Sequence, residues 1–512
     1  MLDAHDFPSN ILLCQKQNPG KSRNLMKPEP LLAARVLLVN FNEYDQPYPV
    51  YPLGLAYVDG ALREDGHVTE IWDVVSPVES LEETVMRFRP DFIGITMRNI
   101  DNQQSHNPRI FTRDLLACVA KLRAVSAAPL ILGGGGFSIF PQQIHELSGV
   151  EFGVVGEGGA TIRRLLRTLR GSGGTLSEIS GLIFRNSKGE TVTVPREREA
   201  ADPAVPPHHD KASLAAYIQE GSPVGVQTQR GCPLKCCYCT YPMIEGNSSR
   251  FRTGEEVAEE LACLAACGVR QVFFVDSVFN TSNKHVVDVC EAILRAGVKI
   301  NWECFLRPSK GTTRELMELM QRAGLNHIEF GSDSFSDPVL RRYGKSFDFE
   351  DIRLVSEHAN ALKIRYTHFI IFGGPGETEA TMEETLARAA TLPNALYFAT
   401  VGMRVYPGTP LWRLACLREP GGEPADCLLE PLFHIEPPLT ASGIQNRLKE
   451  VRQSASNWAI GDPPAAFMET LAKLRRRGKG GNMWEYVELM QRLGTSLQGT
   501  SSAAPIQQNG TT

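Results

Sequence analysis

Apolar runs alternate with amphipathic stretches along most of this chain. The first apolar run, at 34–40, holds the β-branched and long aliphatic residues that are typically buried in a parallel sheet. The predicted strands of this first series are 34–40, 68–74, 91–97, 129–132 and 152–155, and the predicted helices are 53–65, 81–89, 111–123 and one ending near 170. This alternation predicts a doubly wound α/β domain, whose ligands bind beyond the carboxyl ends of the strands.

A second series of apolar runs begins near residue 224. The predicted strands are 224–229, 271–276, 299–305, 327–331, 365–372 and 397–405, and the predicted helices are 254–267, 283–296, 313–323, 349–361 and 379–390. Six strands are too few to close an eight-stranded barrel, so we expect an open one. Chemistry in such barrels belongs at the carboxyl ends of the strands.

The remaining segments lack this alternation. Residues 175–215 combine a predicted hairpin with a proline-rich stretch and are interpreted as a link between the two α/β units. Helical segments rich in Leu, Arg and Glu follow the second unit and predict a cap on the barrel. The predicted divisions are 1–33 (disordered leader), 34–200 (first α/β domain), 216–412 (barrel), 413–494 (helical C-terminal domain) and 495–512 (disordered tail).

Composition and charge narrow the classes of partner. The 512 residues include 53 basic and 58 acidic side chains, a formal net charge of -5, so no global field favours nucleic acid or an anionic membrane. No apolar run approaches the roughly 20 residues needed to span a bilayer. With no apolar signal segment at the N-terminus, the protein is predicted to be cytoplasmic, where its twelve cysteines stay reduced.

Three cysteines stand close together at the end of the first strand of the second unit. Cys232, Cys236 and Cys239 are separated by three and then two residues. Three thiolates on one loop can hold a [4Fe-4S] cluster and leave the fourth iron open to a small molecule. Zinc is disfavoured because no second Cys-x-x-Cys pair or His pair follows at a finger's distance. Cys237, which breaks the spacing, is interpreted as a bystander.

The Cys-x3-Cys-x2-Cys spacing, with the aromatic Tyr238 before the last cysteine, resembles the signature of radical S-adenosylmethionine (SAM) enzymes. The resemblance implies that Cys232, Cys236 and Cys239 bind the cluster and that SAM chelates the open iron. It places Tyr238 near the adenine of SAM and the chain's six strands in an open (β/α)6 barrel. It also implies an electron donor such as flavodoxin or ferredoxin.

Other strand ends extend this resemblance to the SAM site. The turn after the fifth barrel strand resembles the family's glycine-rich stretch that lines SAM; its residues are Gly373, Gly374, Pro375, Gly376 and Glu377. The strand-four stretch 328–334 resembles one that usually ends in Glu-Ser and contacts the ribose or amino group of SAM. Its acid here is Asp333, one methylene shorter, and the resemblance implies Ser332 and Asp333 in SAM binding. Arg307 is a candidate partner for the carboxylate of SAM, or else a member of a surface ion pair.

The first α/β unit resembles the Rossmann-like cobalamin-binding domain of B12-dependent radical SAM enzymes, because its glycine-rich turns precede such a barrel. The residues implied in cobalamin binding are Tyr51, Gly133, Gly134, Gly135, Ser138, Gly156 and Glu157. The Asp-x-His-x-x-Gly motif that supplies a histidine to cobalt is absent from this domain, so other residues must cover the lower face of cobalt. Arg98 and Asn99 are our candidates. The alternatives are an Arg98–Asp101 salt bridge and Thr96 as the wall residue.

The resemblance implies a cobalamin-dependent radical SAM methyltransferase. One SAM would methylate cobalamin, and a second would yield the radical that activates an unactivated carbon of a small-molecule substrate to receive the methyl group. A cyclase or ring-rearrangement enzyme with the same cofactors is one alternative, and a non-catalytic corrinoid or iron-sulfur sensor is another. The sequence assigns no catalytic acid or base.

Overall fold

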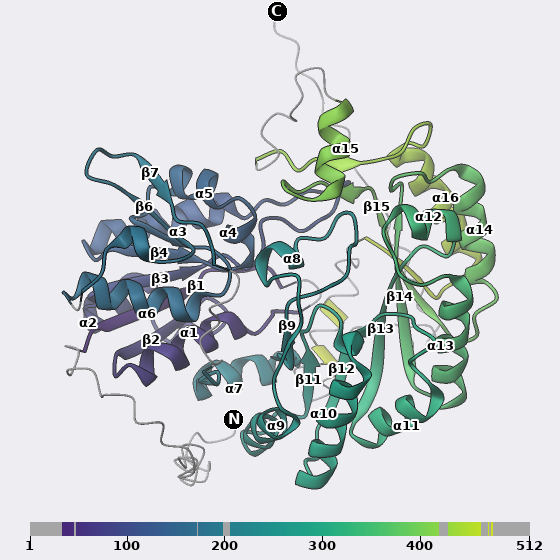
Figure 1. Ribbon diagram of the computed structural model, residues 1–512, viewed down its shortest axis with the longest axis horizontal. Coiled ribbons are helices and arrows are strands. Elements are labelled where there is room, and N and C mark those ends of the chain that lie inside the picture. The colour runs from purple at the N-terminus through teal and green to yellow at the C-terminus, as the bar shows by residue number, and fades with distance from the viewer. Residues whose placement is uncertain are drawn as a thin grey trace, which may run out of the picture.

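The computed structural model describes residues 33–45, 48–171, 173–197, 205–418, 429–461, 469–470 and 473–474. Two α/β units lie side by side in Figure 1, with the N-terminal unit on the left and the barrel on the right. The predicted leader up to residue 32 and the predicted tail at 495–512 lie outside the described residues.

The first unit contains a seven-stranded sheet in the order β2-β1-β3-β4-β5-β6-β7. Its strands are β1 (Arg35–Asn40), β2 (Val68–Asp73), β3 (Phe92–Thr96), β4 (Leu130–Gly133), β5 (Phe152–Val154), β6 (Leu182–Arg185) and β7 (Thr191–Thr193). The first five pair in parallel, and β6 and β7 are antiparallel additions at the edge. The five predicted strands are confirmed. The hairpin interpreted as part of a link instead extends this sheet, because Leu182, Ile183 and Phe184 are buried against it.

Helices cover both faces of this sheet, as a doubly wound fold requires. They are α1 (Leu53–Glu64), α2 (Leu81–Phe88), α3 (Thr112–Val125), α4 (Gly135–Ile139), α5 (Pro141–Ser148) and α6 (Gly158–Leu169), with a short 3-10 turn at Leu176–Glu178. Alternate residues of β1 face opposite layers: Val36 and Leu38 pack toward α1 and α6, whereas Leu37 and Val39 pack toward α2 and α3. The pattern did not predict α4 and α5.

The second unit is an open, wholly parallel sheet in the order β18-β15-β14-β13-β12-β11-β8. Its strands are β8 (Val224–Val226), β11 (Gln271–Phe274), β12 (Asn301–Leu306), β13 (Leu325–Asp333), β14 (Arg365–Phe372), β15 (Leu396–Val401) and β18 (Trp458–Ile460). The six predicted strands are all present. The seventh, β18, comes from the segment predicted to be helical, so that prediction is wrong at these residues.

The helices of the second unit mostly line the outer side of its sheet, but the one at 241–244 lies between the two units and the one at 410–418 lies at the top of the view (Figure 1). They are α7 (Lys211–Gln219), α8 (Tyr241–Ile244), α9 (Gly254–Ala266), α10 (Asn283–Ala296), α11 (Arg314–Arg322), α12 (Asp337–Arg342), α13 (Phe349–Ala361), α14 (Glu379–Ala389), α15 (Pro410–Arg418) and α16 (Ala441–Ser454), with a 3-10 turn at Phe279–Thr281. Several begin with a capping side chain. At α9, for example, Thr253 and Glu256 form a reciprocal capping box.

Two small hairpins complete the second unit. They are β9 (Gln229–Arg230) with β10 (Arg250–Phe251), and β16 (Met403–Arg404) with β17 (Phe433–His434). The first hairpin closes the base of the segment that carries the three cysteines. Of the predicted helical C-terminal domain, α15 and α16 are helical, and most residues from 462 onward lie outside the described residues.

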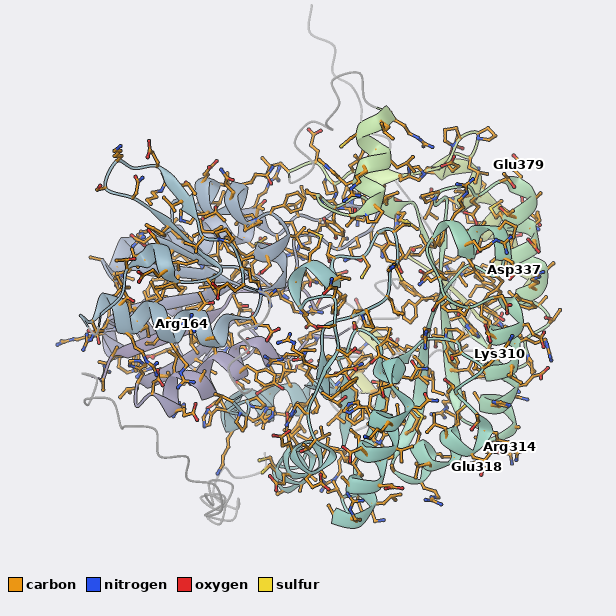
Figure 2. The ribbon with its side chains drawn as sticks, viewed as in Figure 1. Arg164, Lys310, Arg314, Glu318, Asp337 and Glu379 are labelled. Atoms are coloured by element: carbon orange, nitrogen blue, oxygen red, sulfur yellow. The ribbon has the colours of Figure 1, made fainter. Side chains whose placement is uncertain are left out.

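The two units share one apolar core. Tyr51, Leu53 and Ala56 of the first unit are buried in the same cluster as Leu214 and Val224 of the second. Charged side chains such as Arg314 and Glu379 lie along the outer side of the barrel (Figure 2). Within the described ranges, no helix combines the length and the apolarity needed to cross a membrane.

Candidate functional site

The cysteine loop follows β9 at the carboxyl end of the first barrel strand. Gly231 opens it with φ +82°, and a Cβ atom there would collide with the carbonyl oxygen of Ser248. The Cys232 N–H donates to the Gly246 carbonyl at 3.0 Å. These contacts close the loop across its base and hold the three predicted ligand cysteines on one compact segment.

The thiols of this loop are largely removed from water. Burial raises the pKa of Cys236 and raises that of Cys239 to about 12, so iron binding must displace their protons. Within the described residues, no three His, Cys, Asp or Glu side chains lie close enough to share a single metal ion. A [4Fe-4S] cluster does not need that closeness, because each cysteine binds a different iron. The loop therefore fits a cluster better than a single ion.

Cys237 faces away from its neighbours. Its N–H donates to the Tyr343 carbonyl at 2.9 Å, and its Sγ lies 3.9 Å from Met403 Sδ in an apolar cluster. This placement agrees with its interpretation as a bystander.

Behind the loop, Tyr238 belongs to a buried network. Its hydroxyl donates to Asp333 at 2.6 Å, and Lys345 Nζ lies 2.5 Å from the same carboxylate oxygen. Asp333 has φ +63°, a conformation that few residues other than glycine adopt. Burial alone would lower the pKa of Lys345, but the Asp333 carboxylate raises it above its ordinary value. Lys345 escaped the sequence reasoning because a single loop lysine carries no motif.

The structure does not favour the predicted role of the Ser332 side chain at the SAM site. Ser332 is completely buried, and its hydroxyl lies 2.8 Å from His368 Nδ1 inside the core. The Asp333 side chain instead contacts Tyr238 and Lys345, so the two neighbouring residues have separate partners. Only the backbone of Ser332 remains available to a cofactor.

The predicted glycine turn after β14 is built as a closed loop. Gly373 and Gly376 have positive φ, and a Cβ atom on Gly374 would collide with the hydroxyl of Tyr343. The Glu377 carboxylate accepts the Gly373 N–H, while its Oε1 is buried and has no hydrogen-bond partner among the residues that the structure describes. Burial raises the pKa of Glu377 to about 7. Pro375 is buried beside it.

Arg307 lies just beyond β12. Its Nη1 donates to Ser346 at 3.0 Å, and its Nε is buried without a partner in the described chain. The predicted surface ion pair is not formed there. A buried guanidinium N–H that lacks an acceptor is costly, so this side chain is ready for an anionic group.

Asp276, whose role the sequence left open, fixes the approach to the cysteine loop. Its carboxylate accepts the N–H groups of Thr228 and Gln229 at 2.7 and 3.0 Å and the Thr228 hydroxyl at 2.6 Å. Burial raises its pKa to about 7 despite these donors. His285, on the other side of that hydroxyl at 2.8 Å, has its pKa lowered by burial to about 4.

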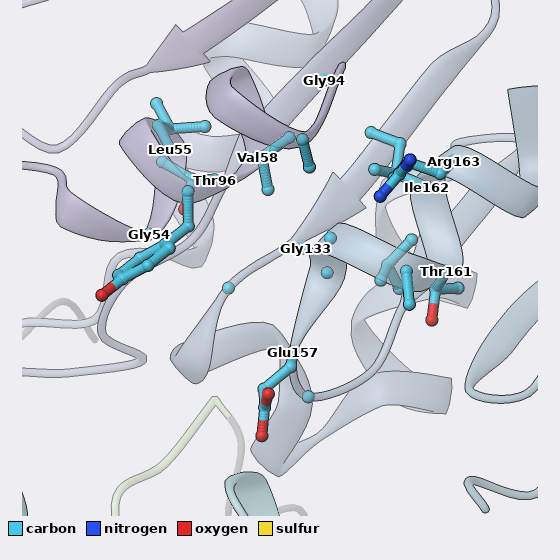
Figure 3. Close-up of a pocket in the computed structure, with 18 of the residues that line it drawn as sticks. Gly54, Leu55, Val58, Gly94, Thr96, Gly133, Glu157, Thr161, Ile162 and Arg163 are labelled. Atoms are coloured by element: carbon cyan, nitrogen blue, oxygen red, sulfur yellow. The ribbon is translucent and has the colours of Figure 1, made fainter. Parts of the chain in front are cut away.

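A cavity of about 340 Å³ lies between the first sheet and helices α1 and α6. Figure 3 shows Gly94, Thr96 and Gly133 on its sheet side, with Val58 and Ile162 on its helix sides. Part of its lining is apolar, and the residues concerned are Leu38, Ile95, Ile131 and Val154. Arg196, Arg230 and Arg250 also line it, together with Glu157, the carboxylate with which all three pair. The cavity therefore suits a ligand with a flat apolar end.

The predicted glycines of the first unit serve close backbone packing as well as this cavity. Gly133, Gly134, Gly135, Gly156 and Glu157 all line it. A Cβ atom on Gly134 would lie 2.5 Å from the Met97 carbonyl oxygen. The absence of side chains in the glycine run therefore lets the loop after β3 pack closely against it. Ser138 does not line the cavity: its hydroxyl donates to Gly134 and accepts the Gly156 N–H, both at 2.8 Å.

The side chains of Tyr51 and Glu157 are already bonded to other residues of the chain. The Tyr51 hydroxyl lies 3.0 Å from His209 Nδ1, and its ring is buried in the shared core, so the structure does not favour its predicted cobalamin contact. Glu157 pairs with Arg196, Arg230 and Arg250.

Arg98 is exposed, and among the described residues it forms no hydrogen bond or ion pair. The alternative salt bridge between Arg98 and Asp101 is not formed, because Asp101 pairs with Arg404 at 2.9 Å. Although its surface reaches water, the surrounding protein withdraws part of the Arg98 guanidinium from solvent and lowers its pKa, and nearby tyrosine hydroxyls, Tyr241 first among them, partly offset this. The adjacent Asn99 is half-buried, and its backbone packs against Gly136. Arg98 thus stays available to a ligand at the carboxyl end of β3.

Family models match both units. The B12-binding domain matches residues 46–166, and the radical SAM superfamily matches residues 226–389. The chain belongs to the cobalamin-dependent radical SAM enzymes. A radical SAM domain implies a [4Fe-4S] cluster and SAM, and a B12-binding domain implies cobalamin.

Relatives of this radical SAM enzyme carry methyltransferase names. An uncharacterized methyltransferase of Pyrococcus horikoshii is 26% identical over 71% of this chain and 78% of its own length. The tryptophan 2-C-methyltransferase of Streptomyces laurentii is 25% identical over 73% of each chain. The solved structure of the methyltransferase TsrM from Kitasatospora setae, with cobalamin and a [4Fe-4S] cluster bound, shares the fold: TM-score 0.78, 23% identity, 90% of this chain and 98% of that chain.

Proposed function

We propose that this enzyme moves a methyl group from SAM, by way of cobalamin, to an unactivated carbon of a small molecule. The observation that carries the proposal is that one cavity is lined by both units. Gly133 and Glu157 come from the first unit, and Gln227, Arg230 and Glu245 come from the segments around the cysteine loop. Cobalamin held by the first unit and SAM held beside the cysteine loop would lie on either side of one substrate. Bringing the two cofactors and the substrate close together is the main contribution of such a scaffold.

The cofactors carry the difficult chemistry: when bound, the cluster with SAM supplies a radical, and cobalamin supplies the methyl group. Cys232, Cys236 and Cys239 would hold the cluster. The glycine turn at 373–377 and Arg307 would hold SAM, with the guanidinium of Arg307 pairing its carboxylate. The Tyr238–Asp333–Lys345 network would keep the loop side of this site rigid.

In the first unit, the glycine-walled cavity would take the nucleotide end of cobalamin, since its apolar lining fits the base of that nucleotide. Arg98 would cover the lower face of cobalt. A permanently charged guanidinium donates but cannot coordinate, so it would disfavour a water ligand there. Asn99 would support it from the same loop.

Methyl transfer is supported by the methyltransferase names of the Pyrococcus horikoshii and Streptomyces laurentii relatives. The cyclase alternative keeps a place in the test, because the anaerobic magnesium-protoporphyrin IX monomethyl ester cyclase of Cereibacter sphaeroides is also similar, at 26% identity over 66% of this chain. Tryptophan is the first substrate to test, because it is named for the Streptomyces laurentii relative and is bound in a second TsrM structure. A reduced flavodoxin or ferredoxin would supply the electron that the reaction needs, and a chemical reductant can replace it in a first assay.

The test is an anaerobic turnover of the reconstituted holoenzyme with deuteromethyl-labelled SAM, followed by mass spectrometry of the cobalamin and of the substrate. We expect label on cobalamin and a trideuteromethyl group in the product. Product formed without label would favour the cyclase or rearrangement alternative. Failure to consume SAM by either route would favour the sensor. The Cys236→Ala variant, which should lose the cluster, is the control. Any label that appears in its product reached the substrate without the radical step.

A further inference from the structure

Glu157 joins the cavity of the first unit to the cysteine loop of the second. It is the residue before α6, lines the cavity, and is about one-fifth exposed (22%). Its Oε2 lies 2.9 Å from Arg230, its Oε1 lies 3.3 Å from Arg196, and Arg250 also pairs with Oε1. Burial alone would raise the pKa of Glu157, but Arg250 and Arg230 hold it below its ordinary value. The carboxylate is therefore charged and fully engaged.

Two of its partners mark the two ends of the cysteine loop. Arg230 and Arg250 are directly opposite each other in the antiparallel β9–β10 hairpin, and Gly231 follows the first of them at once. Like charges in directly opposite positions of an antiparallel pair repel. One carboxylate placed between them offsets that repulsion. Glu157 therefore stabilises the closed base of the loop that carries Cys232, Cys236 and Cys239.

The same contacts continue into the loop. Arg230 Nε donates to Gln227 at 2.8 Å, Gln227 donates to Glu245 at 3.0 Å, and the Glu245 carboxylate accepts the Gly231 N–H at 3.2 Å. Arg230 also lies over the ring of Tyr57 on α1, 4.3 Å from its centroid. A continuous chain of polar contacts thus connects the cavity wall to the residue before the first cysteine.

We infer that Glu157 is a positioning residue through which occupancy of the cobalamin cavity orders the cysteine loop. A ligand in the cavity packs against the first turn of α6 and fixes the position of Glu157. The carboxylate then holds Arg230 and Arg250 together, and with them the two ends of the loop. The inference needs both cofactors to bind, but it does not depend on methyl transfer being the reaction.

The test is hydrogen–deuterium exchange of the full, cluster-loaded chain, under anaerobic conditions, with and without hydroxocobalamin. In the parent protein, we expect cobalamin to slow exchange about fivefold in two places, the cavity wall at 156–164 and the loop at 231–249. In Glu157→Gln, the cavity wall should still be protected, whereas the loop should lose its cobalamin-dependent protection. Glu151→Gln removes another arginine-paired carboxylate of the first unit and should behave like the parent protein.

The outcomes separate the possible failures. Loop protection that persists in Glu157→Gln, or a parent protein in which cobalamin protects only the cavity wall, would overturn the inference. No protection anywhere would instead contradict the cobalamin site itself. If Glu157→Gln folds poorly, Glu157→Gln/Arg250→Gln removes the repulsion as well, so it should restore folding and basal loop protection without restoring the response to cobalamin. A restored response would also overturn the inference.

Discussion

The Asp101 carboxylate accepts a hydrogen bond from Arg404 Nε at 2.9 Å, although the two residues are 303 positions apart and belong to different α/β units. Both side chains are almost completely buried, at 1% and 4% exposure. The guanidinium also donates to the Val405 carbonyl and lies over the Tyr406 ring. This ion pair anchors the loop that carries Arg98 to β16, the short strand that follows β15.

Replacing Arg404 should therefore destabilise the protein strongly. Arg404→Met leaves the Asp101 carboxylate buried without its cation, which costs about 3–5 kcal/mol. The measurement is denaturant unfolding of the purified protein. Arg314→Met is the matched control, because the exposed Arg314–Glu318 pair in Figure 2 contributes about 0.5 kcal/mol or less. Equal losses in the two variants would contradict the prediction.

The adjacent cysteines of the loop should respond differently to substitution. Cys232→Ala, Cys236→Ala and Cys239→Ala should each lose the iron-sulfur cluster, since each removes a ligand. Cys237→Ala should keep it, because that thiol packs against Met403. Iron and sulfide content per chain after anaerobic reconstitution checks both results. A Cys237 variant without a cluster would show that the ligand set is wrong.

Filling the cavity of the first unit should weaken cobalamin binding. Gly133 lines it without positive φ, and a Cβ atom there makes only ordinary contacts of 3.6 Å or more with Val154. Gly133→Leu would extend a larger side chain into the space and should raise the Kd for hydroxocobalamin about tenfold or more. Gly133→Ala adds one methyl group and is the control. Spectroscopic titration measures both, and unchanged affinity in the leucine variant would remove the cavity from the site.

Arg307 should matter for SAM rather than for the cluster. Arg307→Gln removes the charge and the buried Nε donor, so the Kd for SAM should rise about tenfold or more while iron content stays unchanged. Equilibrium dialysis with the cluster-loaded protein provides the measurement. Arg314→Gln, on the exposed side of α11, should leave the Kd as it is. If the Kd for SAM rose equally in both variants, the effect would come from the loss of positive charge in general, and the role of Arg307 would be contradicted.

Asp276 should make stability depend on pH. Its pKa is about 7 in the folded chain, whereas an unfolded aspartate has a pKa of about 4. The folded state keeps a proton that the unfolded state releases. The contribution of Asp276 to stability is therefore greatest below pH 4 and falls by up to about 1.4 kcal/mol per pH unit until the pH passes about 7.

Asp276→Asn should remove that part of the slope in unfolding experiments between pH 5 and 7.5. Its amide can donate to the Thr228 hydroxyl, which then donates to the neutral His285. Glu377, with a pKa also near 7, contributes a slope of the same sign and should remain. An unchanged slope in the Asn variant would contradict the assignment to Asp276.

Local patterns accounted for most of the secondary structure. The short apolar runs marked the parallel strands because both faces of such strands are buried, and the cysteine spacing marked the loop because its chemistry lies within eight residues. The pattern failed where partners are distant. Residues 458–460 form a strand only because the edge of β15 is unpaired without them, and the hairpin at 182–193 joins the first sheet through β5.

The sequence alone determined the two α/β units, the three cysteines and the glycine turns, because each depends on neighbouring residues and on backbone conformations that few residue types adopt. Only the tertiary structure decided which candidate side chains are free to act. Ser332, Tyr51 and Glu157 are engaged by His368, His209 and three arginines, whereas Arg98 is left available because Arg404 takes Asp101. Charge pairing between segments hundreds of residues apart leaves no periodic trace in a sequence.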